Sequence, residues 1–408
     1  MDETGHKIGT RVVHAGQRPE PTTGAVMPAI SLASTYVQSS PGVHQGMDYI
    51  RAHNPTRYAL ERMVALLEGS PITEEQDPSC GGFAFSSGMA AMGTCLELLE
   101  SGSRILAMDD LYGGSTRLLH QVRAKSAGLD IVQVDMSDLH AVEAGMTPDT
   151  RMVWVESPTN PSLKISDLSG ISRIARGINP DVILVCDNTF ASPINQSPLE
   201  HGFDIVMHST TKYLNGHSDS LGGVLVAKKI EHVERLRFLQ KSVGAVASPF
   251  DSYMILRGIK TLDVRMQRHN DSGLKVARFL EAQPQVERVL YPGLESHPQH
   301  ALFKQQMRGS TGMVTFFIKG GIAESRRFLE SVRLFALAES LGGVESLVDH
   351  PAIMTHASVT PEMRRSLGIT DSMIRLSVGI EDVSDLIDDL SQALVAACTP
   401  SIAAASVS

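Results

Sequence analysis

The first candidate for chemistry is a single lysine in a loop rich in hydroxyl side chains, within His208–Gly223. An apolar segment precedes the loop and another, Val224–Ala227, follows it, so Lys212 stands between two predicted buried strands. A lone lysine is most often a surface charge. Here Ser209 and Thr211 can direct hydroxyls at an anion while the amine reaches a carbonyl. Because a partly desolvated lysine is a nucleophile, the pattern predicts a Schiff-base lysine.

A second chemistry is open to the same loop. Ser209–Lys212 matches S-x-x-K, the serine-nucleophile pattern of penicillin-recognising hydrolases, and Ser218-Asp219 is similar to their second motif. That fold places the serine at the start of a helix, whereas a strand-like segment precedes Ser209 here. It also needs a later K-T-G, where this chain has Lys260-Thr261-Leu262. A serine hydrolase is therefore a remote alternative.

A Schiff-base lysine indicates a pyridoxal-phosphate site, which needs an acid beside the pyridine nitrogen. Asp187 meets this need, because it directly follows the apolar segment Val182–Cys186. Parallel strands place their carboxyl ends at one edge of a sheet, and ligands bind there. We therefore expect Asp187 and Lys212 to lie together. Such an ion pair would keep the pyridine ring cationic, and a cationic ring accepts electrons after proton loss.

The other parts of this cofactor also have candidate partners. Ser86-Ser87-Gly88 forms a strand-to-helix turn whose backbone N–H groups suit a phosphate, although plain helix capping is the simpler role of a lone Ser-Gly. Tyr112 follows another predicted strand and can stack on the pyridine ring, although a loop tyrosine can also simply pack on the core. Prolines fix the loop that holds Asn160.

The elements that must position these residues alternate regularly from Phe83 onward. Amphipathic helical segments fall between most of the apolar ones, which predicts a mostly parallel sheet covered by helices on both faces. The predicted strands are Phe83–Ser86, Arg104–Met108, Ile131–Val134, Met152–Glu156, Val182–Cys186, Ile205–His208 and Val224–Ala227.

The N-terminal region reads differently. Residues 1–65 are rich in proline and glycine, which predicts an irregular arm with no helix before Asn54. A helix is then expected over Arg57–Leu67, with Thr56 as its cap. Because an extended arm cannot bury itself, we expect it to lie on a neighbouring subunit.

The C-terminal third predicts a second, smaller unit. A long helical region, Phe250–Ala282, leaves the first unit, and the remainder mixes helices with strands at Met313–Ile318 and Ile374–Val378. We therefore expect an α/β cofactor domain at 66–262 and an α+β domain at 263–408. The Ala/Ser-rich tail 399–408 is expected to be disordered.

Composition excludes several classes of function. The chain of 408 residues has a formal charge of −9 and a pI near 5.9, so nucleic acid and anionic membrane surfaces are not expected partners. Its four cysteines form no C-x-x-C, and its fifteen histidines form no zinc motif, so no metal site is expected. No secretory signal or membrane-spanning run is evident, which predicts a cytoplasmic protein with reduced thiols.

Five separate stretches together resemble the Cys/Met-metabolism PLP-dependent enzymes, and the resemblance runs from about His14 to Ala397. They are Asn54-Pro55-Thr56-Arg57, Ser87-Gly88-Met89-Ala90-Ala91, Asp187-Asn188-Thr189-Phe190, the Lys212 loop and Arg375-Leu376-Ser377-Val378-Gly379. The resemblance implies the type I fold of PLP-dependent transferases, pyridoxal 5′-phosphate as cofactor and a small amino acid as substrate.

The resemblance also implies a role for each matching position. Lys212 would bind the cofactor covalently, Asp187 would pair with its nitrogen and Tyr112 would stack on its ring. Thr189, beside Asp187, is also expected to bind the cofactor. The expected phosphate partners within the chain are Gly88, Met89, Ser209 and Thr211. Tyr49 and Arg51 are expected to reach the phosphate from a neighbouring subunit, in a homotetramer built as a dimer of dimers. The expected substrate-binding residues are Asn160, Ser340, Arg375, Glu339, Asp48 and Arg117.

Within the family, the rim of the pocket favours the γ-lyases, which implies α,γ-elimination of cystathionine to cysteine, 2-oxobutanoate and ammonia. Gly114 stands where methionine γ-lyase-like members have cysteine, and Leu341 stands where β-lyase-like members have an aromatic residue. Glu339 is shared by γ-lyases and γ-synthases, so γ-replacement on an activated homoserine ester remains the main alternative. Asp48 departs from the usual glutamate, and Ala52-His53 departs from Ser-Gly, which affects the expected substrate preference.

Overall fold

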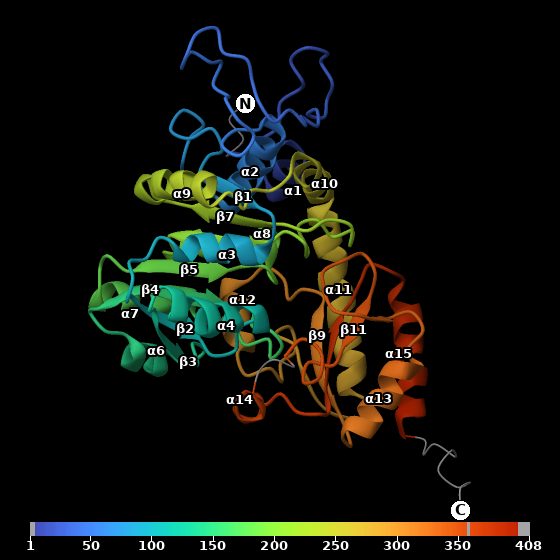
Figure 1. Cartoon of the computed structure of the whole chain (residues 1–408). Coiled ribbons are helices and arrows are strands. Elements are labelled where there is room, and N and C mark those ends of the chain that lie inside the picture. The colour runs from blue at the N-terminus through green and yellow to red at the C-terminus, as the bar shows by residue number, and fades with distance from the viewer. Residues whose placement is uncertain (1–4, 357–359, 399–408) are drawn as a thin grey trace, which may run out of the picture.

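The protein is described by a computed structural model that covers residues 5–356 and 360–398. It contains two sheets side by side, a larger one formed by the first two thirds of the chain and a smaller one formed by the last third (Figure 1). The predicted disordered tail at 399–408 lies outside the described residues. The predicted division at 262/263 falls just inside the helix that connects the two sheets, α11 (Leu262–Glu281), and stays a prediction.

The larger sheet has the strand order β1-β7-β6-β5-β4-β2-β3. β7 runs antiparallel to both of its neighbours, and the other four pairs are parallel, so the predicted mostly parallel sheet is confirmed. Every predicted strand is present within two residues of its expected ends. The strands are β1 (Gly82–Phe85), β2 (Arg104–Met108), β3 (Asp130–Val134), β4 (Thr150–Glu156), β5 (Ile183–Asp187), β6 (Ile205–Ser209) and β7 (Gly223–Ala227).

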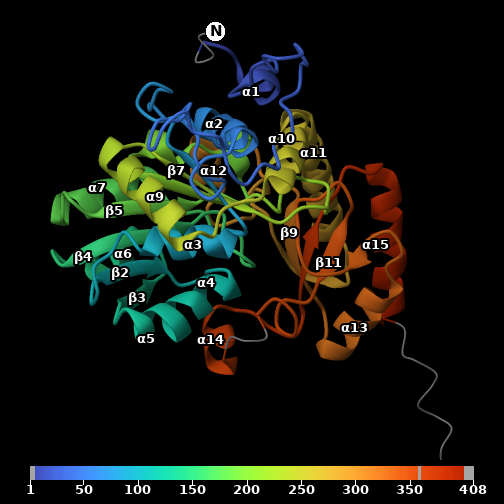
Figure 2. The same ribbon diagram turned by 45° about the horizontal axis from the view of Figure 1, so that its top comes forward.

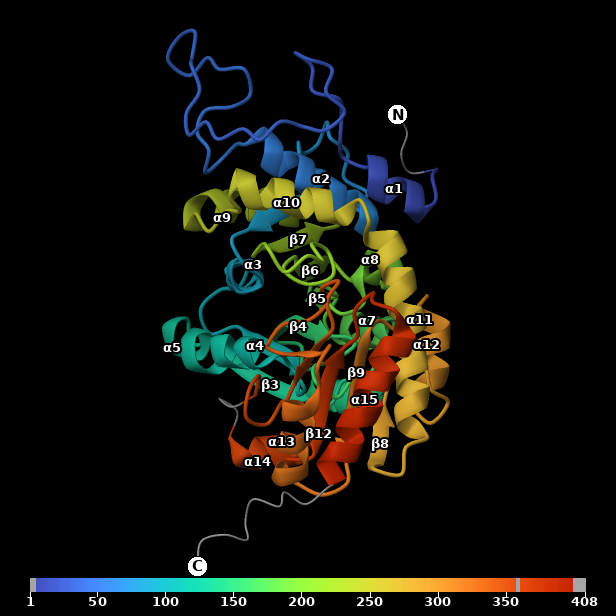
Figure 3. The same cartoon turned by 90° about the vertical axis from the view of Figure 1, so that its right-hand side faces the viewer.

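Helices bury both faces of this sheet. Along β7, Leu225 contributes to the core under α3 (Gly88–Leu96) and α9 (Ile230–Val243). Val224 and Val226 contribute to the core under α2 (Pro55–Glu68) and α10 (Pro249–Ile259) on the other face. Figure 3 shows these layers from the side. Two buried faces explain why the strands have continuous apolar sequences. The other helices of the larger unit are α4 (Gly113–Arg117), α5 (Ala124–Ser126), α6 (Leu139–Gly145), α7 (Leu168–Ile178) and α8 (Ser192–Asn195), with a π-helical turn at Leu118–Arg123 and a 3₁₀ turn at Pro198–His201.

The start of α2 (Pro55–Glu68) corrects one expectation. Asn54, not Thr56, is the cap, because its side chain accepts a hydrogen bond from the N–H of Arg57. Pro55 then occupies the first helical position, where the missing N–H costs nothing. Thr56 lies inside the helix, and its hydroxyl bonds to the backbone of Ala29 and Ser31.

The N-terminal region corrects a second expectation. A short helix, α1 (Ile8–His14), precedes the prolines that were expected to exclude helices before Asn54, and Val12 is buried where α1 packs on α2. Residues 17–53 form extended loops that project from the body of the molecule (Figures 1 and 2). Val26, Leu32 and Val37 are largely exposed along these loops.

The predicted long helical region is two helices. α10 (Pro249–Ile259) begins at Ser248, whose hydroxyl caps it, and ends before α11, with Lys260 and Thr261 between them. α11 leads into the smaller sheet, whose order is β10-β11-β12-β9-β8. Its strands are β8 (Val286–Leu290), β9 (Met313–Ile318), β10 (Ala336–Leu337), β11 (Leu347–Asp349) and β12 (Met373–Ser377); its helices are α12 (His300–Gln306), α13 (Ile322–Ser331), α14 (Pro361–Ser366) and α15 (Val383–Cys398).

None of the helices in 5–356 and 360–398 is long and apolar enough to cross a membrane. Within the same ranges, no group of three His, Cys, Asp or Glu side chains is arranged to hold a metal ion.

Candidate active site

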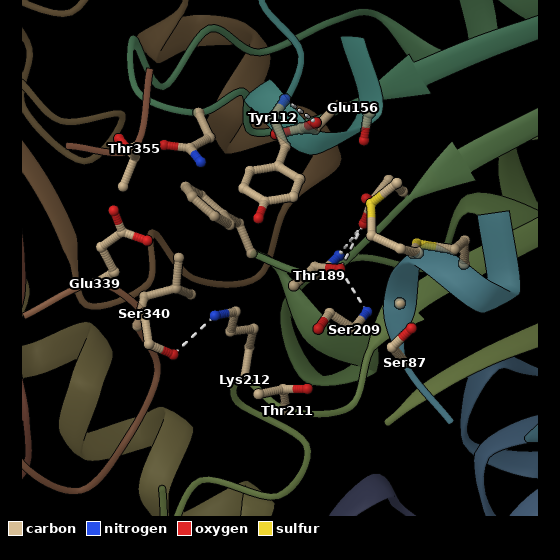
Figure 4. Close-up of a pocket in the computed structure, with 18 of the residues that line it drawn as sticks. Ser87, Tyr112, Glu156, Thr189, Ser209, Thr211, Lys212, Glu339, Ser340 and Thr355 are labelled. Carbon is tan, nitrogen blue, oxygen red and sulfur yellow. Dashed lines mark hydrogen bonds between the residues drawn. The ribbon is translucent and has the colours of Figure 1, made fainter. Parts of the chain in front are cut away.

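A cavity opens where the carboxyl ends of the central strands meet the smaller sheet (Figure 4). β7 is antiparallel to both β1 and β6, so β1 and β6 run in the same direction and end at this same edge. The cavity is lined by Ser87, Gly88, Met89, Tyr112, Ser115, Glu156, Asn160, Asp187, Thr189, Phe190, Met207, Ser209, Thr211, Lys212, Leu221, Glu339, Ser340, Leu341, Thr355 and Arg375. Twelve of the sixteen predicted site residues therefore come together.

Lys212 lies in the middle of this cavity. Its Nζ donates a hydrogen bond of 2.7 Å to the hydroxyl of Ser340, which comes from the smaller unit. Burial and the nearby Arg375 cation lower the pKa of Lys212 to about 8, although Asp349 and Glu339 oppose the shift. A lysine with this pKa has a substantial neutral fraction near neutral pH, and a neutral amine is nucleophilic.

The serine-hydrolase alternative is not supported by this geometry. Ser209 ends strand β6 and does not begin a helix. The amine of Lys212 bonds to Ser340 instead of the Ser209 hydroxyl. The S-x-x-K match therefore does not form the arrangement that the hydrolases need.

Ser340 is held in an uncommon backbone conformation. Its φ of 111° is positive, which is rare for a residue with a side chain. Its hydroxyl accepts the hydrogen bond from Lys212, and its carbonyl accepts one from Arg375 at 3.3 Å. Ser340 in this strained turn therefore bonds to both Lys212 and Arg375.

Arg375 lies at the centre of β12, directly opposite Asp349 of β11. Both side chains are buried and form an ion pair, and a second nitrogen of Arg375 donates to Asn160 Oδ1 at 2.7 Å. A guanidinium offers five donors in a planar fork that matches a carboxylate. Arg375 and Asn160, from different sheets, can therefore hold a carboxylate at the wall opposite the β5 and β6 ends.

Asp187 ends β5 and lies beside Glu156, the last residue of β4, in the strand register. Burial raises the pKa of both carboxyls, and their mutual repulsion raises that of Glu156 further. Thr189 opposes the shift at Asp187 with hydrogen bonds from its N–H (3.0 Å) and hydroxyl (2.5 Å). Because two adjacent buried acids rarely both ionise, Asp187 is the better placed to be the carboxylate and Glu156 the neutral acid.

Glu156 is a site residue that the sequence reasoning missed. Its Oε2 accepts a hydrogen bond of 3.0 Å from the N–H of Tyr112, and so fixes the start of the loop that carries the tyrosine (Figure 4). The available signal was its place as the last residue of a predicted strand beside Asp187. Phe190 and Thr355 also line the cavity without having been assigned a role there, and Leu341 lines it at the rim, where the sequence placed it.

Tyr112 directs its ring into the cavity (Figure 4). The ring packs against Gly114, where an added Cβ would lie 2.4 Å from a ring carbon. A side chain at position 114 would therefore displace the tyrosine. Tyr112 is 42% exposed, and its ring can accept a stacked partner from the cavity.

The structure offers a cradle for a phosphate at the start of α3. Ser87 caps the helix by accepting from the N–H of Ala90, so the N–H groups of Gly88 and Met89 can bind an anion. An added Cβ on Gly88 would lie 3.0 Å from the Cβ of Ser209, so the cradle is tight. Together with the nearby hydroxyls of Ser209 and Thr211, this donor set fits a phosphate.

The residues present therefore fit pyridoxal 5′-phosphate. An amine with lowered pKa, a carboxylate, an aromatic ring and a phosphate cradle surround one cavity. Each is the type of group that the aldehyde, the pyridine nitrogen, the ring face and the phosphate require.

Four predicted site residues are not in the chain's own cavity. Arg117 is exposed at the end of α4 and does not line it. Asp48, Tyr49 and Arg51 lie in the projecting arm, where the Arg51 guanidinium lies over the Tyr49 ring at 5.5 Å and donates to the carbonyl of Lys241 at 2.7 Å. This position leaves the arm residues available to another subunit, while their predicted roles remain proposals.

The lowered pKa of Lys212 gives an expected pH dependence. Capture of pyridoxal phosphate by the apo-protein should accelerate with rising pH and level off above about pH 8, because the amine reacts in its neutral form. Stopped-flow absorbance at several pH values measures this profile. Arg375→Gln should move the midpoint upward, since it removes a cation that lowers the pKa. A wild-type midpoint near 10.5, the ordinary lysine value, would contradict the desolvated site.

Comparisons with known proteins agree with this site. The family model described as Cys/Met metabolism PLP-dependent enzyme matches residues 9–395. The chain is 56% identical to cystathionine β-lyase of Coxiella burnetii, over 95% of this chain and 97% of that protein. It is 52% identical to cystathionine γ-lyase of Homo sapiens, over 97% and 95% respectively. Cystathionine γ-synthase from Xanthomonas oryzae pv. oryzae superposes with a TM-score of 0.91 at 39% identity, over 96% and 98%.

The match covers both sheets and the residues of the cavity between them. The resemblance seen in separate sequence motifs is thus confirmed over nearly the full chain. The chain therefore belongs to the Cys/Met metabolism PLP-dependent enzyme family, and its cofactor is pyridoxal 5′-phosphate.

Proposed function

We propose that this enzyme converts L-cystathionine and water to L-cysteine, 2-oxobutanoate and ammonia by α,γ-elimination. The observation that carries the proposal is Glu339, a carboxylate at the rim of the cavity beside Ser340 (Figure 4). Cystathionine carries a second amino-acid head, whose ammonium can pair with this acid. The high identity to cystathionine γ-lyases supports the same reaction.

The substrate is held by its α-carboxylate. Arg375 and Asn160 are bonded to one another, and Asp349 fixes the guanidinium from behind. This arrangement directs the α-amino group toward Lys212 and the long side chain toward the rim with Glu339. With the carboxylate held in this way, the reacting carbons lie beside the lysine, which reduces the entropic cost of the reaction.

Lys212 moves the protons. Its Nζ is neutral in an appreciable fraction of molecules, so it can remove the proton from Cα and then remove the proton from Cβ. Bound pyridoxal phosphate supplies an aldehyde that captures the substrate amine and a ring that accepts the electron pair left at Cα. Ser340 holds Nζ through its hydroxyl, so the amine stays between the two carbons. Tyr112 covers the site and can protonate the departing sulfur.

Two residues at the rim separate this reaction from those of other family members. Leu341 is buried and lines the cavity where an aromatic residue is expected in β-lyase-like members. Gly114 lets the Tyr112 ring lie against the backbone, a position that the cysteine of methionine γ-lyase-like members would disturb. Both features favour cystathionine γ-elimination.

A second candidate is β-elimination of cystathionine, which gives homocysteine, pyruvate and ammonia. The 56% identity to a cystathionine β-lyase favours it. The two eliminations start from the same substrate and differ in which of its two amino-acid heads reacts, and therefore in which C–S bond breaks. The keto acid produced therefore distinguishes them directly.

A third reaction, γ-replacement, stays open because the fold is shared with a cystathionine γ-synthase. Purified enzyme given an O-acyl homoserine and cysteine tests it. We expect cystathionine formation to be at least about tenfold slower than cystathionine breakdown at matched concentrations, a difference of about 1.4 kcal/mol in barrier. Faster synthesis than breakdown would assign the chain to γ-replacement.

Glu339→Ala is expected to weaken the use of cystathionine selectively. A partly exposed ion pair is worth about 1 kcal/mol, so kcat/KM for cystathionine should fall roughly fivefold. Homoserine, which has no distal ammonium, should be almost unaffected. Steady-state assays with both substrates measure the difference.

Glu345→Ala is a matched control, because Glu345 is a nearby acid that bonds to Ser218 and does not line the cavity. It should leave the ratio of the two substrates unchanged. Equal losses on both substrates in Glu339→Ala would mean that Glu339 is only structural.

We also propose that the enzyme is a cytoplasmic homotetramer with active sites shared between subunits. The exposed apolar residues of the arm support this assembly, because a second copy can cover them. The phosphate cradle supports it as well. Among the described residues that line the cavity, the cations are Lys212 and Arg375, and Lys212 points toward Ser340 (Figure 4). A cation from another subunit would complete the cradle.

A further inference from the structure

A buried ion pair lies under the cofactor site, on the face of the sheet opposite α3. Within β6, Val206 belongs to the core under α2, and His208 follows it on the same face. There His208 Nε2 lies 2.5 Å from Oε1 of Glu68, the last residue of α2. Both side chains are fully buried. The ring nitrogen and the carboxylate oxygen are within hydrogen-bond distance.

This pair is costly for a purely structural element. Buried ion pairs are often no more stabilising than apolar residues of the same volume. In addition, Nδ1 of His208 and Oε2 of Glu68 have no hydrogen-bond partner among the described residues. Each buried polar atom without a partner destabilises the fold. The position of the pair therefore calls for another explanation.

The pair touches both strand ends that carry the cofactor groups. Oε1 of Glu68 also accepts a hydrogen bond of 3.0 Å from the side chain of Asn188, the residue after Asp187. The N–H of Asn188 bonds to the carbonyl of Met207, the residue before His208. Glu68 thus holds the end of β5 against the end of β6.

The pair also acts on Asp187 electrostatically. The titratable groups around Asp187 are Glu156 on β4, Cys186 on its own strand and His208 on β6. Burial raises the pKa of Asp187, and the hydrogen bonds from Thr189 and, to a smaller extent, the charge of His208 oppose this rise. His208 therefore favours the proton residing on Glu156 and the charge on Asp187.

We propose that His208, held by Glu68, is a positioning residue that keeps Asp187 aligned with the pyridine nitrogen of the cofactor. The inference rests on the proposed pairing of Asp187 with that nitrogen, and it is independent of which thioether the enzyme cleaves. A protonated pyridine nitrogen needs a carboxylate partner, while a ring without the nitrogen does not.

The test compares two ligands of the apo-protein, pyridoxal phosphate and its 1-deaza analogue, in which C–H replaces the ring nitrogen. Equilibrium dialysis gives the affinity ratio of the two. Asp187→Asn should abolish the preference of the wild type for the pyridine ligand. His208→Gln and Glu68→Gln should each reduce the preference by roughly fivefold to tenfold, up to about one pKa unit of charge stabilisation. Glu68→Gln preserves volume and provides a second variant if His208→Gln does not fold.

His297→Gln is the matched control, since His297 is also a buried histidine but does not line the cavity. It should leave the ratio unchanged. If both His208→Gln and Glu68→Gln bind the two ligands with equal losses and an unchanged ratio, while Asp187→Asn abolishes the preference, the pair is only structural and the inference is wrong. If Asp187→Asn itself keeps the preference, the proposed pairing of Asp187 is wrong, and the inference fails with it.

Discussion

Lys212→Ala should abolish turnover of cystathionine, with a loss of about a thousandfold or more in kcat/KM. On the proposed mechanism, the variant lacks both the amine that captures the cofactor covalently and the base that removes the substrate protons. The purified variant should also lack the visible absorbance of a lysine-bound cofactor. Absorbance spectra and steady-state assays of the same samples measure both effects.

Two controls separate this loss from a general defect. Lys212→Arg keeps a cation at the site but supplies no nucleophile, so it should be as inactive as the alanine variant. Lys260→Ala removes another half-buried lysine, which donates to the carbonyl of Val13 far along the chain, and should retain activity and colour. An active Lys212→Ala, or a wild type that never acquires cofactor absorbance, would contradict the assigned role.

Mixing two inactive variants should restore activity if subunits share their sites. Arg51→Ala should lose cofactor affinity, because a guanidinium would no longer reach the neighbour's phosphate cradle. In a hybrid dimer with Lys212→Ala, one site receives an intact lysine from one chain and an intact arginine from the other. Random subunit exchange should therefore restore roughly a quarter of wild-type activity per chain.

The hybrid is measured by assaying the two variants before and after subunit exchange under mild denaturant. Mixing Arg51→Ala with Arg51→Ala-Lys212→Ala is the control, since no combination of these chains contains an intact site. Exchanged mixtures that never exceed their parents would contradict the shared site. Arg51 would then serve only its own chain, where it bonds to the carbonyl of Lys241.

The larger sheet could be predicted because its strands carry a local signal. β2 (Arg104–Met108) has the ends that its apolar run indicated, because strands buried on both faces have nearly continuous apolar sequences. The same holds for β9 (Met313–Ile318) in the smaller sheet. Helix starts were less certain. Thr56 and Asn54 are both good caps, and only the extended backbone of Asn54 with Pro55 after it decides between them.

The site residues were likewise only partly predictable from the local sequence. Asp187, Ser87 and Lys212 follow recognisable strands, so their convergence follows from the parallel sheet alone. Ser340 and Arg375 come from the smaller sheet, and nothing local in the sequence places them beside Lys212; the family resemblance did. The Glu68–His208 pair had no signal at all, because 140 residues separate its members and each looks like an ordinary strand or helix end.

The keto acid formed from L-cystathionine by the purified wild-type enzyme tests the central claim most directly. Chromatographic separation distinguishes 2-oxobutanoate from pyruvate, and thiol analysis distinguishes cysteine from homocysteine in the same reaction. The account predicts 2-oxobutanoate and cysteine in equal amounts as the main products, because Leu341 lines the cavity where β-lyase-like members have an aromatic residue. Pyruvate and homocysteine as the main products would contradict it and assign the chain to β-elimination.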